Sequence, residues 1–217
     1  MNPHLSPRRL ASAMLSLMHL PARDADLVQI MNASLADAAR RAGVFLACGI
    51  GCTQCCHGAF AINALDAARL RAGMAELQAT NSALFSEVAR RAREWLREHG
   101  ADFPGDRKTG ALGNSAEDRS RFQDFANDAA CPALDPATGR CDVYAWRPMT
   151  CRVFGPPVRT MDDNDAEGLG HCELCFIGAT PEQVAACEMP VSHDLETELL
   201  HEIGASFETV VAFALLP

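Results

Sequence analysis

Four cysteines lie within nine residues of this chain, in the run Cys48-Gly-Ile-Gly-Cys52-Thr-Gln-Cys55-Cys56. Thiols this close together cannot all pair in unstrained local disulfides, whereas their thiolates are ligands for zinc, iron or an iron–sulfur cluster. The spacing Cys52-x2-Cys55 lets two sulfurs bind one ion from a single turn, and Cys48 adds a third sulfur one turn earlier. Cys55 and Cys56 are neighbours that point in different directions, which suits two metals, or one ligand and one packed thiol.

The other six cysteines follow residues 57–130, which contain none. They are Cys131, Cys141, Cys151, Cys172, Cys175 and Cys187. Simple zinc knuckles show C-x2-C pairs in series, whereas several of these cysteines are single and about ten residues apart. We therefore expect a metal site shared between the two batches. Cys187 falls in a predicted helix, where a buried structural thiol is the better interpretation.

Both cysteine batches resemble those of a known family. The run Cys48-x3-Cys52-x2-Cys55-Cys56-His57 is similar to the signature of the YkgJ family, whose CxxCxxCC cluster chelates zinc or iron. The stretches Cys131-Pro-Ala-Leu-Asp135, Gly139-Arg-Cys141-Asp-Val-Tyr144 and Arg147-Pro148-x2-Cys151-Arg152 resemble its downstream pattern, so the resemblance covers about residues 48–175. It implies metal association of eight cysteines: Cys48, Cys52, Cys55, Cys56, Cys131, Cys141, Cys151 and Cys172. Cys175 is additional, and the final ligand is open between Cys172 and Cys175.

Two histidines lie beside cysteines and have alternative interpretations. His57 either ligates metal or donates its N–H to a sulfur, and His171 is either a ligand or a solvated loop residue. The sequence has no glycine-rich phosphate loop, Ser-His-Asp order or HExxH motif, so no catalytic residue is assigned.

Two arginines flank Cys151 and have a predicted electrostatic role. Arg147 and Arg152 could offset the negative charge of a multi-thiolate site or bind an anionic substrate. The alternative for Arg147 is that it braces a proline turn through backbone carbonyls. Tyr144 and Trp146 are expected to pack over the site.

Composition limits the class of protein. A chain of 217 residues with 48% apolar content is long enough for a real core and is expected to form one domain, or one domain with a small appendage. No apolar run is long enough to span a membrane. The net charge of −9 and the few aromatic residues argue against nucleic acid as partner.

Clustered cysteines in a chain of this size favour metal binding in the reducing cytoplasm over an exported disulfide scaffold. Pro7-Arg8-Arg9 before the apolar stretch 10–20 is the competing export signal, without a clean cleavage site.

The elements that must position the cysteines are predicted to be mainly α: a helical scaffold with an irregular cysteine-rich metal-binding segment. Residues 100–118 are predicted to be a loop without a core, and residues 131–178 to be turns held by cross-links. As domains, we expect an N-terminal helical extension over 1–47, a cysteine-cluster domain with inserted helices over 48–178, and C-terminal helices over 179–217 on the same core. Apolar spacing and caps predict helices over about 6–18, 24–43, 63–79, 81–99 and 119–130, a short helix from Pro181, and one from Ser192 or Asp194 to about Leu215.

The sequence therefore predicts a cytoplasmic protein whose partner is a metal ion, zinc or iron, including a 4Fe-4S cluster. A zinc site would be closed and structural, whereas an iron–sulfur centre would permit electron transfer or sensing. The same cysteine domain is found in flagellin lysine N-methylases, so an S-adenosylmethionine-dependent protein lysine methylase-like enzyme is one alternative. Another is metal storage or delivery, in which extra thiols such as Cys56, Cys175 and Cys187 exchange metal. Ligand spacing does not distinguish zinc from iron.

Overall fold

The structure is a computed structural model that describes residues 20–49, 51–161 and 167–216. The helix predicted over residues 6–18 lies outside this part of the chain. The described chain divides into two compact units, each assembled from stretches that are distant in the sequence. Unit 1 contains residues 53–148 and 200–216, together with Leu20 and Pro21, and unit 2 contains the described residues of 22–52 and 149–199.

Helices make up about half of the described residues and the strands are short. Unit 1 contains η2 (Gln54–Cys56), β1 (Ile62–Asn63), α3 (Ala64–Thr80), α4 (Ser82–His99), β2 (Gly105–Asp106), β3 (Ala111–Leu112), α5 (Ala116–Gln123), β4 (Leu134–Asp135), β5 (Arg140–Cys141), η3 (Tyr144–Trp146), β8 (Glu208–Thr209) and α9 (Val211–Ala214). Unit 2 contains α2 (Asp24–Ala42), η1 (Gly43–Phe45), α6 (Met149–Val153), β6 (Val158–Met161), β7 (Glu167–Gly170) and α7 (Pro181–Ala185). Helix α8 (His193–Ile203) begins in unit 2 and ends in unit 1.

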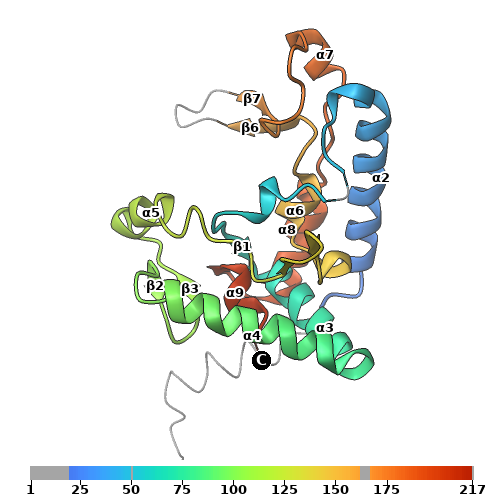
Figure 1. Ribbon diagram of the computed structural model, residues 1–217. Coiled ribbons are helices and arrows are strands. Elements are labelled where there is room, and N and C mark those ends of the chain that lie inside the picture. Colours follow the sequence, from blue (N-terminus) through green and yellow to red (C-terminus); the bar gives the residue numbers. More distant parts are fainter. Residues whose placement is uncertain (1–19, 50, 162–166, 217) are drawn as a thin grey trace, which may run out of the picture. The chain divides into compact units, whose positions relative to one another are not determined.

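The helix pair α3–α4 forms the centre of unit 1 and begins where the sequence predicts. The Asn63 side chain accepts a hydrogen bond from the backbone N–H of Asp66 at 3.0 Å, and Asn81 accepts one from Leu84 at 3.1 Å. These caps satisfy N–H groups that have no partner inside the helix. Helices α3 and α4 lie side by side, and α9 contacts both (Figure 1). Their apolar faces form the main core of unit 1, which includes Ile62, Leu70, Met74, Val88, Ala92, Val143, Val211 and Leu215.

Three local predictions are wrong. The helix predicted over about 119–130 lies instead at Ala116–Gln123, where the Ser115 side chain accepts a hydrogen bond from the backbone N–H of Asp118 at 3.0 Å. Residues 100–118 contain the β2–β3 hairpin, and Phe103 is buried with Trp95 in a second apolar cluster of unit 1. One aromatic side chain therefore gives a core to a segment whose glycines and charges suggest none. The final helix predicted to reach Leu215 ends instead at Ile203, because Gly204 follows with a φ of +68°, and β8 then pairs with β1.

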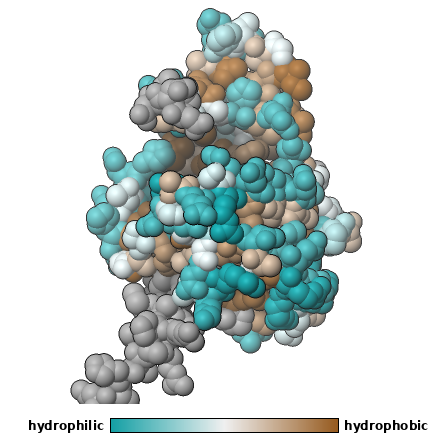
Figure 2. Space-filling view, turned by 90° about the vertical axis from the view of Figure 1, so that its left-hand side faces the viewer, coloured by the Kyte–Doolittle hydropathy of each residue, from teal (hydrophilic) through white to brown (hydrophobic). Residues whose placement is uncertain are grey.

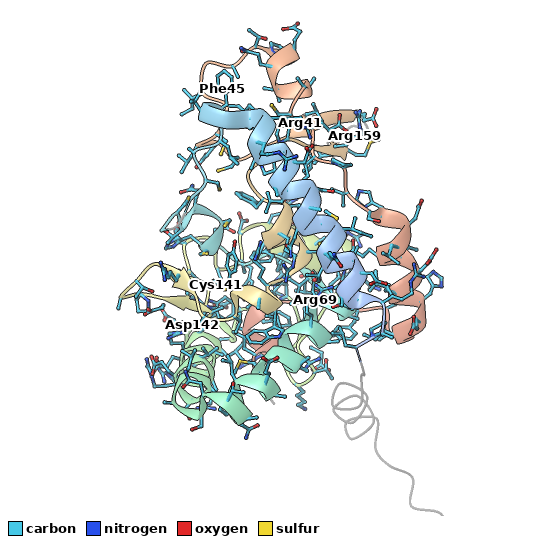
Figure 3. The ribbon with its side chains drawn as sticks, turned by 90° about the vertical axis from the view of Figure 1, so that its right-hand side faces the viewer. Arg41, Phe45, Arg69, Cys141, Asp142 and Arg159 are labelled. Carbon is cyan, nitrogen blue, oxygen red and sulfur yellow. The ribbon has the colours of Figure 1, made fainter. Side chains whose placement is uncertain are left out.

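Unit 2 is arranged around α2, which begins at Asp24 and ends at Ala42. Helix α6 packs on α2, and Arg152 donates a hydrogen bond to Asn32 at 3.1 Å. Arg41, near the end of α2, donates to the backbone carbonyls of Ala186 and Glu188 after α7. Arg41 and Arg159 are labelled in Figure 3, and both bind the segment around Glu188. Polar anchors of this kind hold short elements that have little core of their own.

The exposed surface mixes polar and apolar residues. Figure 2 shows hydrophilic residues spread over one face of the chain, interspersed with smaller apolar patches. Among the described helices, none has the length and the apolar character that crossing a bilayer requires.

Close packing of α3 on η3 gives a first prediction. A Cβ atom added at Gly73 would lie 2.4 Å from the Cγ and Cδ2 atoms of the Trp146 ring. We expect Gly73→Ala to lower the free energy of unfolding by about 1–3 kcal/mol, because overpacking outweighs the helix preference of alanine. Denaturant unfolding measures the change. Gly168→Ala is the control, because its Cβ meets nothing within 4 Å. Equal losses in both variants would contradict the prediction.

Candidate metal centre

Antiparallel backbone pairing brings the first cysteine run of unit 1 beside Cys131. The backbone N–H of Cys131 donates to the carbonyl of Cys56 at 2.7 Å, and the N–H of Gly58 donates to the carbonyl of Ala129 at 2.9 Å. Gly58 has a φ of +84°, and a Cβ there would lie 2.9 Å from the carbonyl oxygen of Asn127. The glycine therefore permits the two segments to approach closely. Cys55 and Cys56 are held next to Cys131 by this pairing.

A hairpin then brings Cys141 to the same place. Strand β4 pairs with β5 so that Leu134 lies opposite Cys141. The turn between them is held by Asp135, whose carboxylate accepts a hydrogen bond from the backbone N–H of Ala137 at 3.0 Å. Both Cys131 and Cys141 pack against the main core of unit 1. We call Cys55, Cys56, Cys131 and Cys141 the unit 1 cysteine set.

Arg91 of α4 clamps both sides of this hairpin. Its Nε donates to the carbonyl of Pro132 at 2.9 Å, and its Nη2 lies 2.5 Å from the carboxylate of Asp142. The Arg91 side chain is only 11% exposed, so water screens these contacts weakly. Pro132 follows Cys131 and Asp142 follows Cys141, and Figure 3 labels the latter pair. The clamp therefore fixes the backbone at two of the cysteines.

Backbone amides already point at these sulfurs. The Sγ of Cys131 accepts hydrogen bonds from the N–H groups of Ala133 and Leu134, and that of Cys141 accepts one from Val143. Such bonds favour the thiolate, which is the form that binds metal. Burial acts in the opposite direction and dominates, raising the pKa of Cys131 to about 12 and that of Cys141 above its usual value.

The pKa of Cys55 is shifted mainly by its neighbour Cys56. A hydrogen bond from the neighbouring Cys56 side chain, together with burial, raises the pKa of Cys55. The Arg147 guanidinium acts against this and lowers the pKa of both Cys55 and Cys141. Arg147 is 7% exposed and is the positive charge that faces this set. It fits the charge-compensation hypothesis.

Arg147 also braces its own turn. It donates to the backbone carbonyl of Tyr144 at 3.1 Å, and its guanidinium lies 3.8 Å from the centre of the Tyr144 ring. Both predicted roles of Arg147, charge compensation and turn bracing, therefore describe contacts that it makes. Tyr144 is 61% exposed, and Trp146 packs into the main core against Gly73.

An open groove of about 860 Å³ runs beside Cys131. Its walls come from α4 and from residues 124–136, and they carry the carboxylates of Glu94, Glu98, Asp124 and Asp128. Acidic walls raise the local concentration of cations. The unit 1 set thus has an acidic approach at Cys131.

Unit 2 contains the other six cysteines. Cys172 and Cys175 are buried, and their side chains are hydrogen-bonded to each other. Cys187 is buried in the same apolar cluster, as its interpretation as a packed thiol requires. Cys48 packs against that cluster, Cys52 ends the N-terminal stretch of the unit, and Cys151 lies on α6.

The two candidate histidines take different positions. His57 forms an isolated antiparallel bridge with Ala130, which belongs to the pairing described above, and its side chain is exposed. The Nδ1 atom of His171 lies 3.0 Å from the carbonyl oxygen of Cys172, and its ring lies against Phe176.

The donor set fits a thiophilic metal by chemistry, although its sulfurs are not yet in ligand positions. Among the described residues, no group of three or more His, Cys, Asp or Glu side chains is already arranged to hold a metal ion. None of the ten cysteines, all of which the structure describes, forms a disulfide, and thiolate sulfur is the ligand that zinc and iron–sulfur centres use. Binding therefore requires these thiols to reorient and to lose their protons.

Removing the clamp should weaken metal binding at the unit 1 set. We expect Arg91→Met to lower metal affinity by about 10–100-fold, as loss of an orienting contact around metal ligands does. A titration in competition with a chromogenic chelator measures the affinity. Arg93→Met is the matched control, since Arg93 is exposed two positions further along α4. An Arg91 variant with wild-type affinity would show that the clamp does not position the ligands.

The metal-free protein should lose stability at alkaline pH. The pKa of Cys131 is raised from 9.0 to about 12, so the native state keeps a proton that the unfolded chain releases between these values. The stabilisation is complete below about pH 9 and is lost as the pH rises through about 12. Urea unfolding of chelator-treated protein should show a falling free energy over this range, with a smaller slope in Cys131→Ala. An unchanged slope in that variant would assign the effect to other groups.

Comparison with known proteins agrees with the cysteine pattern. The family model CxxCxxCC, described as a putative zinc- or iron-chelating domain, matches residues 47–175. Searches of curated proteins and of solved structures returned no match. The matched region covers more than half of the chain and contains nine of its ten cysteines, all except Cys187. Its boundaries agree with the sequence resemblance over residues 48–175. The chain therefore belongs to the CxxCxxCC family of zinc- or iron-chelating domains.

Proposed function

We propose that this chain is a metal-binding protein that holds zinc or iron through cysteine thiolates, with the unit 1 set as one group of ligands. One observation carries the proposal: the backbone pairing of Cys131 with Cys56 and the β4–β5 hairpin bring cysteines from three separate chain segments near one another in unit 1. The family's description as zinc- or iron-chelating supports the same conclusion.

The surroundings of the unit 1 set suit a thiolate centre. Four thiolates and one divalent ion carry a formal charge of about −2, which a nearby cation must offset. Arg147 is buried and faces Cys55 and Cys141, so it supplies that charge without being a ligand. Amide donors on Cys131 and Cys141 further spread the negative charge of the sulfurs.

The contacts around the unit 1 set are those that a bound metal requires. A bound zinc ion would supply a structural cross-link, and an iron–sulfur centre would supply one-electron redox chemistry. Reduced thiols are required in either case, so a reducing cytoplasmic compartment is the setting that we propose.

Metal delivery is a second candidate function, and the groove favours it. Glu94, Glu98, Asp124 and Asp128 line an open approach to Cys131. Carboxylates bind divalent ions weakly and thiolates bind them tightly. Carboxylates at the groove surface followed by the Cys131 thiolate would therefore pass a cation from solvent to sulfur. Rapid exchange of bound metal with a chelator would favour delivery over a permanent structural role.

Anaerobic purification with elemental analysis tests the proposed function. We expect zinc or iron to co-purify, and a visible charge-transfer band to appear if the centre contains iron and sulfide. Chelation should lower the free energy of unfolding by about 4 kcal/mol if free metal was about 1,000-fold above its dissociation constant. The double variant Cys131→Ser/Cys141→Ser should lose metal, whereas the control Cys187→Ala should keep it. Protein that contains no metal after loading, and whose stability chelators leave unchanged, would refute the proposal.

A further inference from the structure

Unit 2 contains a second group of four cysteines with a regular spacing. Cys48-x3-Cys52 and Cys172-x2-Cys175 are two pairs, and each has the separation from which a short turn can present two sulfurs to one zinc ion. The unit 1 set, by contrast, combines two adjacent cysteines with two single ones. We call Cys48, Cys52, Cys172 and Cys175 the unit 2 cysteine set.

These two pairs converge within unit 2. Burial raises the pKa of the Cys172 thiol most, and the neighbouring Cys175 and Cys52 thiols raise that pKa further. The backbone N–H of Cys172 donates to the carbonyl of Gly155 at 3.2 Å. A Cβ atom added at Gly155 would lie 3.3 Å from the Sγ of Cys48. Cys48 and Cys172 therefore meet on either side of Gly155, whose φ of +124° only glycine adopts readily.

An apolar shell surrounds the Cys172–Cys175 half of this set. Cys172 is 3% exposed and Cys175 is 1% exposed, whereas Cys48 and Cys52 are partly exposed. The rings of Phe45 and Phe176 stack with their centres 6.1 Å apart, and the N–H of Phe176 donates to the carbonyl of Phe45 at 2.7 Å. The backbone N–H of Leu174 donates to the Sγ of Cys172, a bond that favours a thiolate. Enclosure of this kind is typical of structural zinc sites, which keep no open coordination position.

The chain segments that carry these cysteines have little regular structure to hold them together. The described residues of 43–52 contain only the short helix η1, and residues 171–180 contain turns and bends. These two segments are joined by the bond between Phe176 and Phe45 and by a small apolar cluster. A metal bound by two cysteines from each segment would tie them together, as metals do in small domains with little core.

We propose that Cys48, Cys52, Cys172 and Cys175 bind one zinc-type ion in a closed structural site of unit 2, and that this site fills independently of the unit 1 set. The inference rests on the proposed function, because it assumes that the chain binds metal. On loading, the four thiols release four protons to solvent as the thiolates bind one Zn²⁺. The proposed ligand set leaves out Cys187, which lies in the same apolar cluster, and Cys151, which lies on α6.

Zinc loading of the full-length, reduced protein tests this division. We expect two zinc ions per chain in the wild type, one in Cys172→Ser/Cys175→Ser and one in Cys131→Ser/Cys141→Ser. Hydrogen exchange gives a second readout: the amides of Cys172, Cys175 and Phe176, which are bonded to Gly155, Cys172 and Phe45, should lose protection only in the first double variant. Cys187→Ala, a change in the same apolar cluster, should keep two ions.

The outcomes separate this inference from the proposed function. If either double variant loses all bound zinc, the two sets act as one centre, and the inference is overturned while the proposed function stands. If the wild type binds no metal, the proposed function itself fails. Should the serine variant not fold, cobalt titration of the wild type decides: thiolate-to-cobalt absorption that saturates at two equivalents supports two sites, and saturation at one overturns them. Cys175→His, which retains a zinc ligand, should keep two ions.

Discussion

The pairing of residues 56–59 with residues 126–131 is the interaction on which the unit 1 cysteine set depends. Cys56 and Cys131 are 75 residues apart in the sequence, and closing so long a loop costs conformational entropy that thiols alone do not recover. The helix pair α3–α4 occupies nearly half of the intervening chain and shortens the flexible part of that loop. Backbone hydrogen bonds then set the register, and the β4–β5 hairpin adds Cys141 at little further entropic cost because its turn is short.

The two cysteine sets differ in what surrounds the sulfurs. Arg147 and an acidic groove border the unit 1 set, so charged groups lie next to it. Aromatic rings and buried thiols surround the unit 2 set, where a charged group is costly until a metal neutralises it. Burial raises the pKa of thiols in both places, so the metal-free chain keeps them protonated near neutral pH. Metal affinity in such sites depends on pH because protons must leave first.

Local signals in the sequence predict the long helices well, and they do not indicate which distant segment lies beside each cysteine. Asn63 and Asn81 mark the starts of α3 and α4 in the sequence, because the side chain of an N-cap residue hydrogen-bonds to a backbone N–H in the first turn of its helix. The sequence does not predict the β2–β3 hairpin within residues 100–118, because that structure depends on the burial of Phe103. Nor does it predict the end of α8 at Gly204, which depends on the positive φ of a single residue. Spacing groups Cys52 with Cys55, yet the boundary between the units falls between them. Sequence spacing describes one turn of chain, whereas the partner of each cysteine is set by pairing with a distant segment.

The placement of the aromatic residues has a spectroscopic consequence. The chain contains two tryptophans and one tyrosine, and Trp95, Trp146 and Tyr144 all belong to unit 1. Trp95 packs among phenylalanines and Trp146 lies in the main core. Intrinsic fluorescence therefore reports the packing of unit 1 directly, while unit 2 has only phenylalanines and is nearly silent in this signal. A fluorescence melting curve of this protein therefore follows unit 1, whereas a circular dichroism curve follows the helices of both units.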